Sequence, residues 1–551
     1  MDTRVEKLFA WRVDAPVLTL AVALLLASAS NQTFWSTFTQ ATGGASLDRL
    51  PLLAGAFLML VLFFNACLTM ASFRYVAKPV LIALILTASA ASYFMATYGI
   101  VIDKAMVQNV FETDAREAME LISWHLVATV CLLGVLPSLL IARARIHFPQ
   151  GPKGLMQRFG IAAGSLALAA LLLLLCFKSL APTLREHREL RFLLTPTNFI
   201  QATHAYLRKR WAASLVVAPL GRDAVKGATW TGQQRRTLTV IVVGETARAA
   251  NFSLNGYARE TNPLLARQAG LINFSNVLSC GTATAVSVPC VFSALGRDGY
   301  SQSKAMSQEG LLDVLTHAGF DVIWRDNNSG CKGVCARVKY EDLSKPAGPD
   351  SHCGAKECYD ERLLEGLPEL IRSSTRDLVI VLHQKGSHGP AYANRYPREF
   401  SRFGPVCTSN RFEECSRESI QAAYDNTILY TDYFLSKTID MLRDIAGSGG
   451  LDTAMLYFSD HGESLGENNM YLHGAPYFLA PREQTEVPMM LWMSPGFSER
   501  FRLDRRCLNE RRKQPLSHDN VFHSVLGMLD VNTAVLNPRL DLFHSCVRGG
   551  G

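Results

Sequence analysis

Residues 238–246 read Leu-Thr-Val-Ile-Val-Val-Gly-Glu-Thr, an apolar run that ends in a glycine and two polar residues. A run of this length that is rich in valine and isoleucine and is bounded by glycine is typical of a buried strand. Four similar runs follow at 322–324, 378–382, 454–458 and 487–492, and they alternate with helical patterns at 308–318 and 417–445. The alternation predicts an α/β domain with a largely parallel sheet covered by helices.

Polar side chains that could do chemistry follow four of these runs, at the point where each strand is expected to end. Ligands of such sheets bind beyond the carboxyl ends of the strands, so we expect these side chains to meet at one edge. They are Glu245 after 238–243, Asp326, Asn327 and Asn328 after 322–324, His383 and His388 after 378–382, and Asp460 and His461 after 454–458.

Residues 279–290 contain a candidate nucleophile and read Ser-Cys-Gly-Thr-Ala-Thr-Ala-Val-Ser-Val-Pro-Cys. Read alone, this stretch is a disulfide-stapled turn of small residues. Beside Glu245, Asp460 and His461 it has a second interpretation, because two carboxylates and an imidazole suit zinc and leave a fourth position for Thr284. Zinc lowers the pKa of bound water from about 15.7 to about 7, and a threonine hydroxyl would be activated in the same way.

Further candidates for the site are two histidines and a basic loop. His388 and His473 would bind a second metal, contact the phosphate, leaving group or acceptor, or transfer a proton, although each alone also suits a structural role. Lys332 lies with Asn328 and Ser329 in a stretch that contains two cysteines, and its ammonium and the amide donors suit phosphate oxygens.

Charge and hydropathy divide the 551-residue chain, which is 48% hydrophobic and carries a net charge of +7. This mild charge does not suggest a nucleic-acid partner. The apolar excess lies in the first 180 residues, where five stretches reach the roughly 20 apolar residues that a membrane span needs, namely 14–31, 50–72, 79–98, 121–142 and 160–180. The first stretch is not expected to be a cleaved signal peptide, because four more spans follow it. Lysine and arginine are concentrated before the first span and in alternate loops, which predicts a cytoplasmic N-terminus and a C-terminal domain on the outside.

The thirteen cysteines divide in the same way. Cys67, Cys131 and Cys176 lie inside apolar runs and are expected to be buried thiols. The other ten form five nearest-neighbour pairs, the last assigned by elimination: Cys280/Cys290, Cys331/Cys335, Cys353/Cys358, Cys407/Cys415 and Cys507/Cys546. Five disulfides imply an oxidising compartment, and the spacings do not make the paired CxxC pattern of a cysteine zinc site.

Two other segments belong to the membrane-facing part of the expected architecture. In the outer loop 103–120, Asn109, Thr113 and Glu117 recur every four residues and share one helix face, which is either a solvated face or a polar wall for a lipid headgroup. Residues 181–235 mix basic and apolar side chains, as a segment on a membrane surface does, although a simple linker is the alternative. The expected division is therefore a transmembrane domain at 1–180, a bridging segment at 181–235 and a catalytic domain at 236–551.

Taken together, five motifs resemble those of the lipid A phosphoethanolamine transferases, the membrane enzymes that include the mobile colistin-resistance proteins. The resemblance extends over essentially the whole chain. The motifs are Val-Val-Gly-Glu-Thr-Ala-Arg (242–248), the threonine loop (279–290), Asp-Asn-Asn-Ser (326–329), Ser-His-Gly-Pro (387–390) and Ser-Asp-His-Gly-Glu-Ser-Leu-Gly-Glu (459–467).

The resemblance implies an alkaline-phosphatase-like fold, Thr284 as the nucleophile and zinc bound by Glu245, Thr284, Asp460 and His461. A second zinc ion is left open. The residues implied to line the substrate site are Asn109, Thr113, Glu117, Asn328, Ser329, Lys332, His388, Glu463 and His473.

The function implied is transfer of phosphoethanolamine from phosphatidylethanolamine to a lipid A phosphate through a threonine intermediate. The protein is expected to be a monomer in the inner membrane of a Gram-negative cell, with its catalytic domain in the periplasm. Its reaction would reduce the negative charge of the outer surface and so give resistance to polymyxins. The alternatives are a phosphoglycerol transferase of the lipoteichoic-acid type, another acceptor, or a membrane sensor without chemistry. A sulfatase is disfavoured, because its nucleophile lies in a C/S-x-P-x-R motif and Cys290 is followed by Val-Phe-Ser-Ala.

Overall fold

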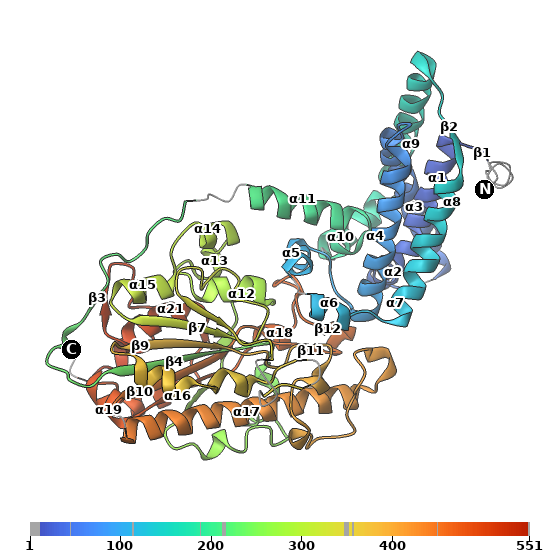
Figure 1. The fold of residues 1–551 in the computed structure, drawn as a ribbon. Coiled ribbons are helices and arrows are strands. Elements are labelled where there is room, and N and C mark those ends of the chain that lie inside the picture. Colours follow the sequence, from blue (N-terminus) through green and yellow to red (C-terminus); the bar gives the residue numbers. More distant parts are fainter. Residues whose placement is uncertain are drawn as a thin grey trace, which may run out of the picture. The chain divides into compact units, whose positions relative to one another are not determined.

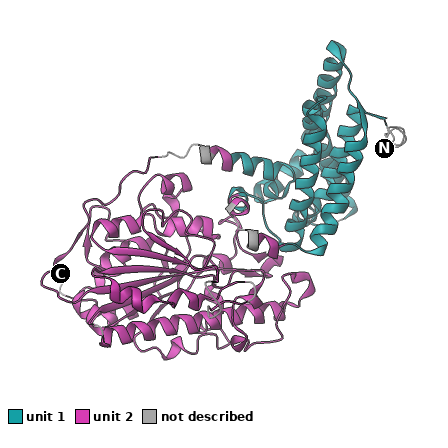
Figure 2. Ribbon diagram, in the orientation of Figure 1, with its two compact units in different colours: residues 1–107, 122–205 teal, residues 108–121, 206–551 magenta. Residues whose placement is uncertain are grey.

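The computed structural model describes residues 12–44, 46–112, 115–187, 189–211, 216–346, 352–354, 357–448 and 450–548. The chain forms two compact units (Figure 2). The first, the helical unit, contains residues 1–107 and 122–205, and the second, the sheet unit, contains residues 108–121 and 206–551. A short segment between two helices of the first unit therefore belongs to the second.

Within the described residues, the helical unit has five stretches of helix that are long and apolar enough to cross a membrane, at Ala15–Ala41, Leu47–Ala71, Ala77–Tyr98, Trp124–Arg143 and Gly151–Ala181. All five predicted spans are thus confirmed as helices. The first is longer than expected, because a single 3-10 turn separates one helix from the next. The helices concerned are α1 (Ala15–Ala27), α2 (Gln32–Ala41), α3 (Leu50–Ala71), α4 (Ala77–Tyr98), α7 (Trp124–Thr129), α8 (Leu136–Arg143) and α9 (Gly151–Glu186).

A buried polar cluster joins three of these helices. The Thr19 hydroxyl of α1 lies 3.1 Å from Asn65 Oδ1 and 3.1 Å from Thr69 Oγ1 of α3, and Asn65 Nδ2 donates to Ser165 Oγ of α9 at 3.2 Å. Such hydrogen bonds between helices stabilise membrane bundles, in which the hydrophobic effect between helices is weak.

The expectation that the three cysteines of this unit are buried was wrong for two of them. Cys67 and Cys131 are exposed on their helices, and Cys176 is half-buried. An apolar span can present an apolar side chain outward as readily as inward, so hydropathy alone does not say which face of the helix packs against its neighbours.

Beyond α9 the chain packs back onto the helical unit through α10 (Leu190–Leu193) and α11 (Thr197–Trp211). Asn31 binds the backbone of this returning segment through both the nitrogen and the oxygen of its side-chain amide. Its Nδ2 donates to the Thr195 carbonyl at 2.6 Å, and its Oδ1 accepts the Thr195 N–H at 2.8 Å. A short parallel pair, β1 (Arg12–Asp14) and β2 (Arg145–His147), completes the unit.

In the part of the sheet unit that the structure describes, the central sheet has seven strands in the order β5-β13-β10-β4-β9-β7-β8. The five strands from β10 to β8 run parallel to one another, and β13 and β5 each run antiparallel to their inner neighbour. The predicted largely parallel sheet is therefore confirmed. Its strands are β4 (Thr237–Gly244), β5 (Ile272–Phe274), β7 (Asp321–Asp326), β8 (Lys339–Asp342), β9 (Leu378–His383), β10 (Asp452–Ser459) and β13 (Met489–Met493).

Helices cover both faces of this sheet (Figure 1). On one face lie α12 (Thr284–Val291), α15 (Leu311–His317) and α21 (Asp519–Met528), whose apolar side chains form one buried cluster with Ile241, Val381 and Phe458. The long helix α17 (Arg417–Ser448) lies on the other face (Figure 1). Both predicted helical patterns, 308–318 and 417–445, correspond to α15 and α17.

Shorter elements and five disulfides complete the unit. The helices are α5 (Lys104–Glu112), which begins in the helical unit, α6 (Ala115–Glu120), α13 (Gly296–Gly299), α14 (Gln302–Met306), α16 (Leu367–Ser373), α18 (Arg482–Thr485), α19 (Pro495–Arg500) and α20 (Arg505–Glu510). The small strands are β3 (Val225–Lys226), β6 (Val277–Leu278), β11 (Ser464–Leu465), β12 (Tyr471–Leu472), β14 (Leu516–Ser517) and β15 (Val531–Asn532). The disulfides are Cys280–Cys290, Cys331–Cys335, Cys353–Cys358, Cys407–Cys415 and Cys507–Cys546.

Candidate active site

Strand register places the first groups of the site. In the parallel pair β4–β10, Gly244 lies opposite Ser459, so Glu245 and Asp460 leave the sheet side by side. Gly462 allows the chain after Asp460 and His461 to pass close to its neighbour, because a Cβ at this position would collide with the carbonyl oxygen of Glu483. The carboxyl ends of the adjacent strands β4 and β10 thus place their polar side chains next to each other.

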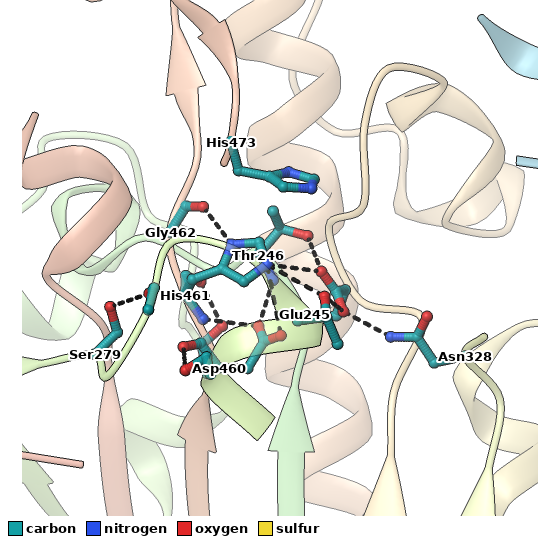
Figure 3. A network of polar contacts seen from close by, with 12 residues as sticks. Glu245, Thr246, Ser279, Asn328, Asp460, His461, Gly462 and His473 are labelled. Atoms are coloured by element: carbon teal, nitrogen blue, oxygen red, sulfur yellow. Dashed lines mark hydrogen bonds and ion pairs between the residues drawn. The ribbon is translucent and has the colours of Figure 1, made fainter. Parts of the chain in front are cut away.

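Glu245, Asp460 and His461 form a cluster in which one ligand atom from each lies within 4.8 Å of the others (Figure 3). His461 Nε2 is 3.3 Å from Glu245 Oε1 and 3.5 Å from Asp460 Oδ2. All three side chains are fully buried. Thr284, at the start of α12, donates its hydroxyl hydrogen to Glu245 Oε2 at 2.9 Å and lies 3.3 Å from His461 Nε2.

The hydrogen bonds of the cluster leave specific atoms for a cation. Asp460 Oδ1 accepts the N–H groups of Thr246 and His461, whereas the buried Oδ2 meets no hydrogen-bond donor among the described residues. His461 Nδ1 donates to the Gly462 carbonyl at 2.8 Å, which leaves Nε2 to face the carboxylates. A histidine held in this way at one nitrogen is typical of a metal ligand at the other.

The electrostatics of the cluster also favour a positive charge at its centre. Burial and the neighbouring Glu245 carboxylate raise the pKa of Asp460 to about 6. Burial opposes a charge on His461, but the two carboxylates outweigh it and raise the imidazole pKa to about 10. Two buried carboxylates need a cation to compensate them, so the donor set, its geometry and its charge all fit a divalent metal ion.

Thr246 is a residue of the site that the sequence analysis did not select. Its hydroxyl donates to Glu245 Oε1 at 2.9 Å and its backbone N–H donates to Asp460 Oδ1 at 3.2 Å, so one residue orients both carboxylates. Its backbone has φ of 54°, a left-handed conformation that is unfavourable for a β-branched side chain. The Tyr424 hydroxyl, which donates to the Thr246 carbonyl at 2.7 Å, holds this conformation in place.

Three of the predicted substrate residues make hydrogen bonds to the cluster or to each other. Asn328 Nδ2 donates to Glu245 Oε2 at 2.7 Å and to the Gln384 carbonyl at 3.0 Å, so this amide orients a carboxylate. Lys332 Nζ donates to the Ser329 hydroxyl at 3.0 Å and to the Ser329 carbonyl at 3.1 Å in the same loop. Behind Asn328, His383 pairs with Asp326 at 3.0 Å.

The remaining predicted histidines lie in one row beside the cluster. The rings of His461 and His473 have centroids 4.5 Å apart, and those of His473 and His388 are 5.4 Å apart. His473 Nδ1 is 3.2 Å from Glu463 Oε1, and Glu463 is fully buried. Asn109 lies on α5, next to Gln108, whose side chain donates to the carbonyl of Ala285 on α12. Thr113 and the side chain of Glu117 lie outside the described residues.

His518 is a second group that sequence reasoning missed. Its Nδ1 accepts the Cys280 N–H at 3.1 Å and its Nε2 donates to the Ser459 carbonyl at 3.0 Å, so the ring joins the threonine loop to the end of β10. No local motif surrounds this histidine, and its partners lie 238 and 59 residues away in the sequence.

The fold and the cluster define a class: a parallel-sheet enzyme domain of the alkaline-phosphatase and sulfatase type, in which the Thr284 hydroxyl faces a buried cluster of two carboxylates and a histidine. The Sulfatase family model matches residues 237–531, and the model described as Phosphoethanolamine transferase EptA/EptB matches residues 60–211.

Similar proteins define the family more closely. Phosphoethanolamine transferase EptA from Escherichia coli K12 is 39% identical over 97% of this chain and 98% of its own length. Phosphatidylethanolamine transferase Mcr-1 from Escherichia coli is 41% identical over 86% of this chain and 89% of its own. The structure of the integral membrane lipooligosaccharide phosphoethanolamine transferase A from Neisseria meningitidis matches with a TM-score of 0.93 and 34% identity, over 98% of this chain and all of that one. The chain belongs to the EptA family of phosphoethanolamine transferases, which confirms the resemblance that its motifs indicated.

The bonds of Thr246 lead to a prediction for metal affinity. Thr246→Val keeps the shape of the side chain but removes the hydroxyl that orients Glu245, and loss of such an orienting partner weakens metal binding by about 10- to 100-fold. Zinc titration of the full-length protein in competition with a chelator measures the effect. Thr246→Ser, which keeps the hydroxyl, is the control, and unchanged affinity in Thr246→Val would contradict the role assigned to Thr246.

His518 leads to a prediction for acid stability. Burial lowers the pKa of His518 to about 3, against about 6.5 in an unfolded chain. The unfolded state therefore binds the proton first, and stability falls by about 1.4 kcal/mol per pH unit as the pH drops from about 6.5 toward about 3. In His518→Gln, whose amide does not titrate, we expect a lower unfolding midpoint at neutral pH but a smaller decrease on acidification. Unfolding curves of wild type and variant between about pH 6.5 and about pH 4 make the comparison, and parallel slopes would show that His518 does not titrate in this way.

Proposed function

We propose that this protein transfers phosphoethanolamine from phosphatidylethanolamine to a phosphate of lipid A, with Thr284 as the covalent carrier and zinc as the metal. The observation that carries the proposal is the position of the Thr284 hydroxyl, 2.9 Å from Glu245 and 3.3 Å from His461, at the rim of the buried acidic cluster. Thr284 is the one member of this group that is not fully buried, so a substrate can reach it.

The metal would be held by Glu245, Asp460, His461 and Thr284. Zinc accepts both carboxylate oxygen and imidazole nitrogen in a four-ligand site, and this donor set is of that kind. When bound, zinc lowers the pKa of a coordinated hydroxyl and stabilises negative charge on a reacting phosphate.

In the first step, Thr284 Oγ1 attacks the phosphorus of the donor lipid. A Thr284–phosphorus bond forms, the bond from phosphorus to the glycerol oxygen breaks, and diacylglycerol leaves with that oxygen. The hydrogen bond to Glu245 Oε2 orients the hydroxyl, and its proton passes to solvent as the new bond forms. We assign protonation of the departing oxygen to the pair of His388 and His473, since His473 is oriented by Glu463.

In the second step, a phosphate oxygen of lipid A attacks the same phosphorus atom. The Thr284–phosphorus bond breaks, the threonine recovers its proton, and the acceptor gains phosphoethanolamine through a new phosphorus–oxygen–phosphorus linkage. Lys332 and Ser329 would meet the anionic oxygens of donor or acceptor, and Asn109, Thr113 and Glu117 would line the donor headgroup, whose ammonium suits a carboxylate.

The setting of the reaction follows from its two lipid substrates. Residues 1–180 would hold the enzyme in the inner membrane, residues 181–235 would connect the two parts, and residues 236–551 would act in the periplasm, where disulfides form. Each transfer adds an ammonium to the outer surface, which weakens adsorption of polymyxins and other cationic peptides. The names of the similar proteins, which include transferases for Kdo(2)-lipid A, support the choice of acceptor.

The covalent step is tested by the intact mass of the purified protein after incubation with zinc and phosphatidylethanolamine but no acceptor. We expect wild type to gain one phosphoethanolamine group and Thr284→Ala to gain none, because only the hydroxyl can form the phosphoester. Thr282→Ala is the matched control: its hydroxyl lies two residues away and donates to the Ala475 carbonyl, and it should keep the adduct.

Two results would contradict the proposal in different ways. An adduct from phosphatidylglycerol alone would indicate the rival phosphoglycerol transferase. Absence of any adduct in protein shown to contain zinc would exclude the threonine carrier. Removal of zinc with a chelator should abolish adduct formation, and zinc should restore it.

A further inference from the structure

Residues 108–121 belong to the sheet unit, although the chain on both sides of them belongs to the helical unit (Figure 2). They include most of α5 and all of α6. We call this stretch the inserted segment. Among the described residues, a contact near each of its two ends touches an element of the candidate active site.

At its first residue the inserted segment contacts the nucleophile helix. Gln108 is 2% exposed, and its Nε2 donates to the carbonyl of Ala285 at 3.1 Å. Ala285 directly follows Thr284 in α12. The first anchor of the segment is therefore one residue from the hydroxyl that reacts.

Near its last residue the inserted segment contacts a buried arginine. The guanidinium of Arg395 binds both carboxylate oxygens of Glu120, with Nη2 2.6 Å from Oε2 and Nη1 3.3 Å from Oε1. Asn410 Nδ2 also donates to the backbone carbonyl of Glu120. A bidentate pair of this kind fixes orientation as well as distance.

Arg395 binds two further groups of the sheet unit. Its Nε donates to the carbonyl of His388 at 2.6 Å, and its Nη1 pairs with Glu357. The Arg395 side chain has no exposed surface, and a buried guanidinium is stable only when its charge is compensated. The same cation therefore binds the inserted segment on one side and the loop that bears His388 on the other.

We propose that Arg395 is a positioning residue for the donor reaction: through Glu120 it holds the inserted segment between Thr284 and His388, so that the segment forms the donor-side wall of the active site. The proposal rests on the proposed function, because it gives Asn109, which lies between the two anchors, its place beside the donor headgroup. Gln108 fixes the wall at the nucleophile, and Arg395 fixes it at the loop that delivers the proton.

If Arg395 only stabilised the fold, loss of either of its carboxylate partners would have the same effect. Glu357 is therefore the control that separates a structural role from a positioning role. Glu120 and Glu357 are both carboxylate partners of Arg395, and their side chains are 21% and 16% exposed. Glu120→Gln and Glu357→Gln each remove one negative charge from the same arginine, at similar burial. Only the first weakens the bond to the inserted segment.

The experiment compares two substrates in full-length protein in detergent with zinc. One is phosphatidylethanolamine, and the other is a soluble aryl methyl phosphodiester, which needs Thr284 but lacks the ethanolamine headgroup that the wall would contact. For Glu120→Gln we expect the ratio of lipid turnover to aryl-ester turnover to fall about ten-fold, mainly through a higher KM for the lipid. Glu357→Gln should keep the wild-type ratio, and Glu120→Asp should recover part of the loss. Equal ratios in the two glutamine variants would overturn the positioning role.

Hydrogen–deuterium exchange supplies a readout that does not depend on turnover. Amides of residues 108–121 should exchange faster in Glu120→Gln than in wild type or in Glu357→Gln, and equal exchange in all three would overturn the proposal. If wild type turned over neither substrate, the proposed function would fail, and the exchange data would still decide whether Arg395 holds the segment.

Discussion

Two carboxylates buried at the ends of adjacent parallel strands are the constraint on which the active site depends. Glu245 and Asp460 are delivered together because Gly244 and Ser459 are register partners, and the sheet cannot separate them without breaking its ladder. Because both are fully buried, their mutual repulsion must be balanced by positive charge. The surrounding residues serve this balance: Thr246 and Asn328 orient the oxygens, and His461 completes the cluster.

Other parts of the sheet unit set where Thr284, the proposed nucleophile, lies relative to that charge. α12 begins at Thr284, and its apolar residues pack in the same buried cluster as β4 and β10. His518 adds a polar bridge between the threonine loop and the end of β10. The position of Thr284 is thus determined by packing and by a neutral histidine as well as by its bond to Glu245. Because several independent contacts fix it, the hydroxyl is placed for reaction before a substrate binds.

Much of this arrangement could be predicted from the sequence because its signals are local. The apolar run before Glu245 identifies a strand, and polar residues after it identify the functional edge of a parallel sheet. The residues that reasoning missed act over long sequence separations: Gln108 reaches Ala285 over 177 positions, and Arg395 reaches Glu120 over 275. Neither has a motif that marks it. Asn328 was expected to line the substrate site, and only packing reveals that its amide is directed at Glu245.

The chain passes between its two units three times, at residues 107–108, 121–122 and 205–206. A fragment that starts after the last span would keep the acidic cluster, Thr284 and the five disulfides described above, yet it would lack Gln108 and Glu120. Arg395 would then retain Glu357 as its carboxylate partner from this network. An inhibitor selected against such a fragment would bind an active site that lacks the inserted segment. Its measured affinity would therefore not apply to the full-length enzyme in a membrane.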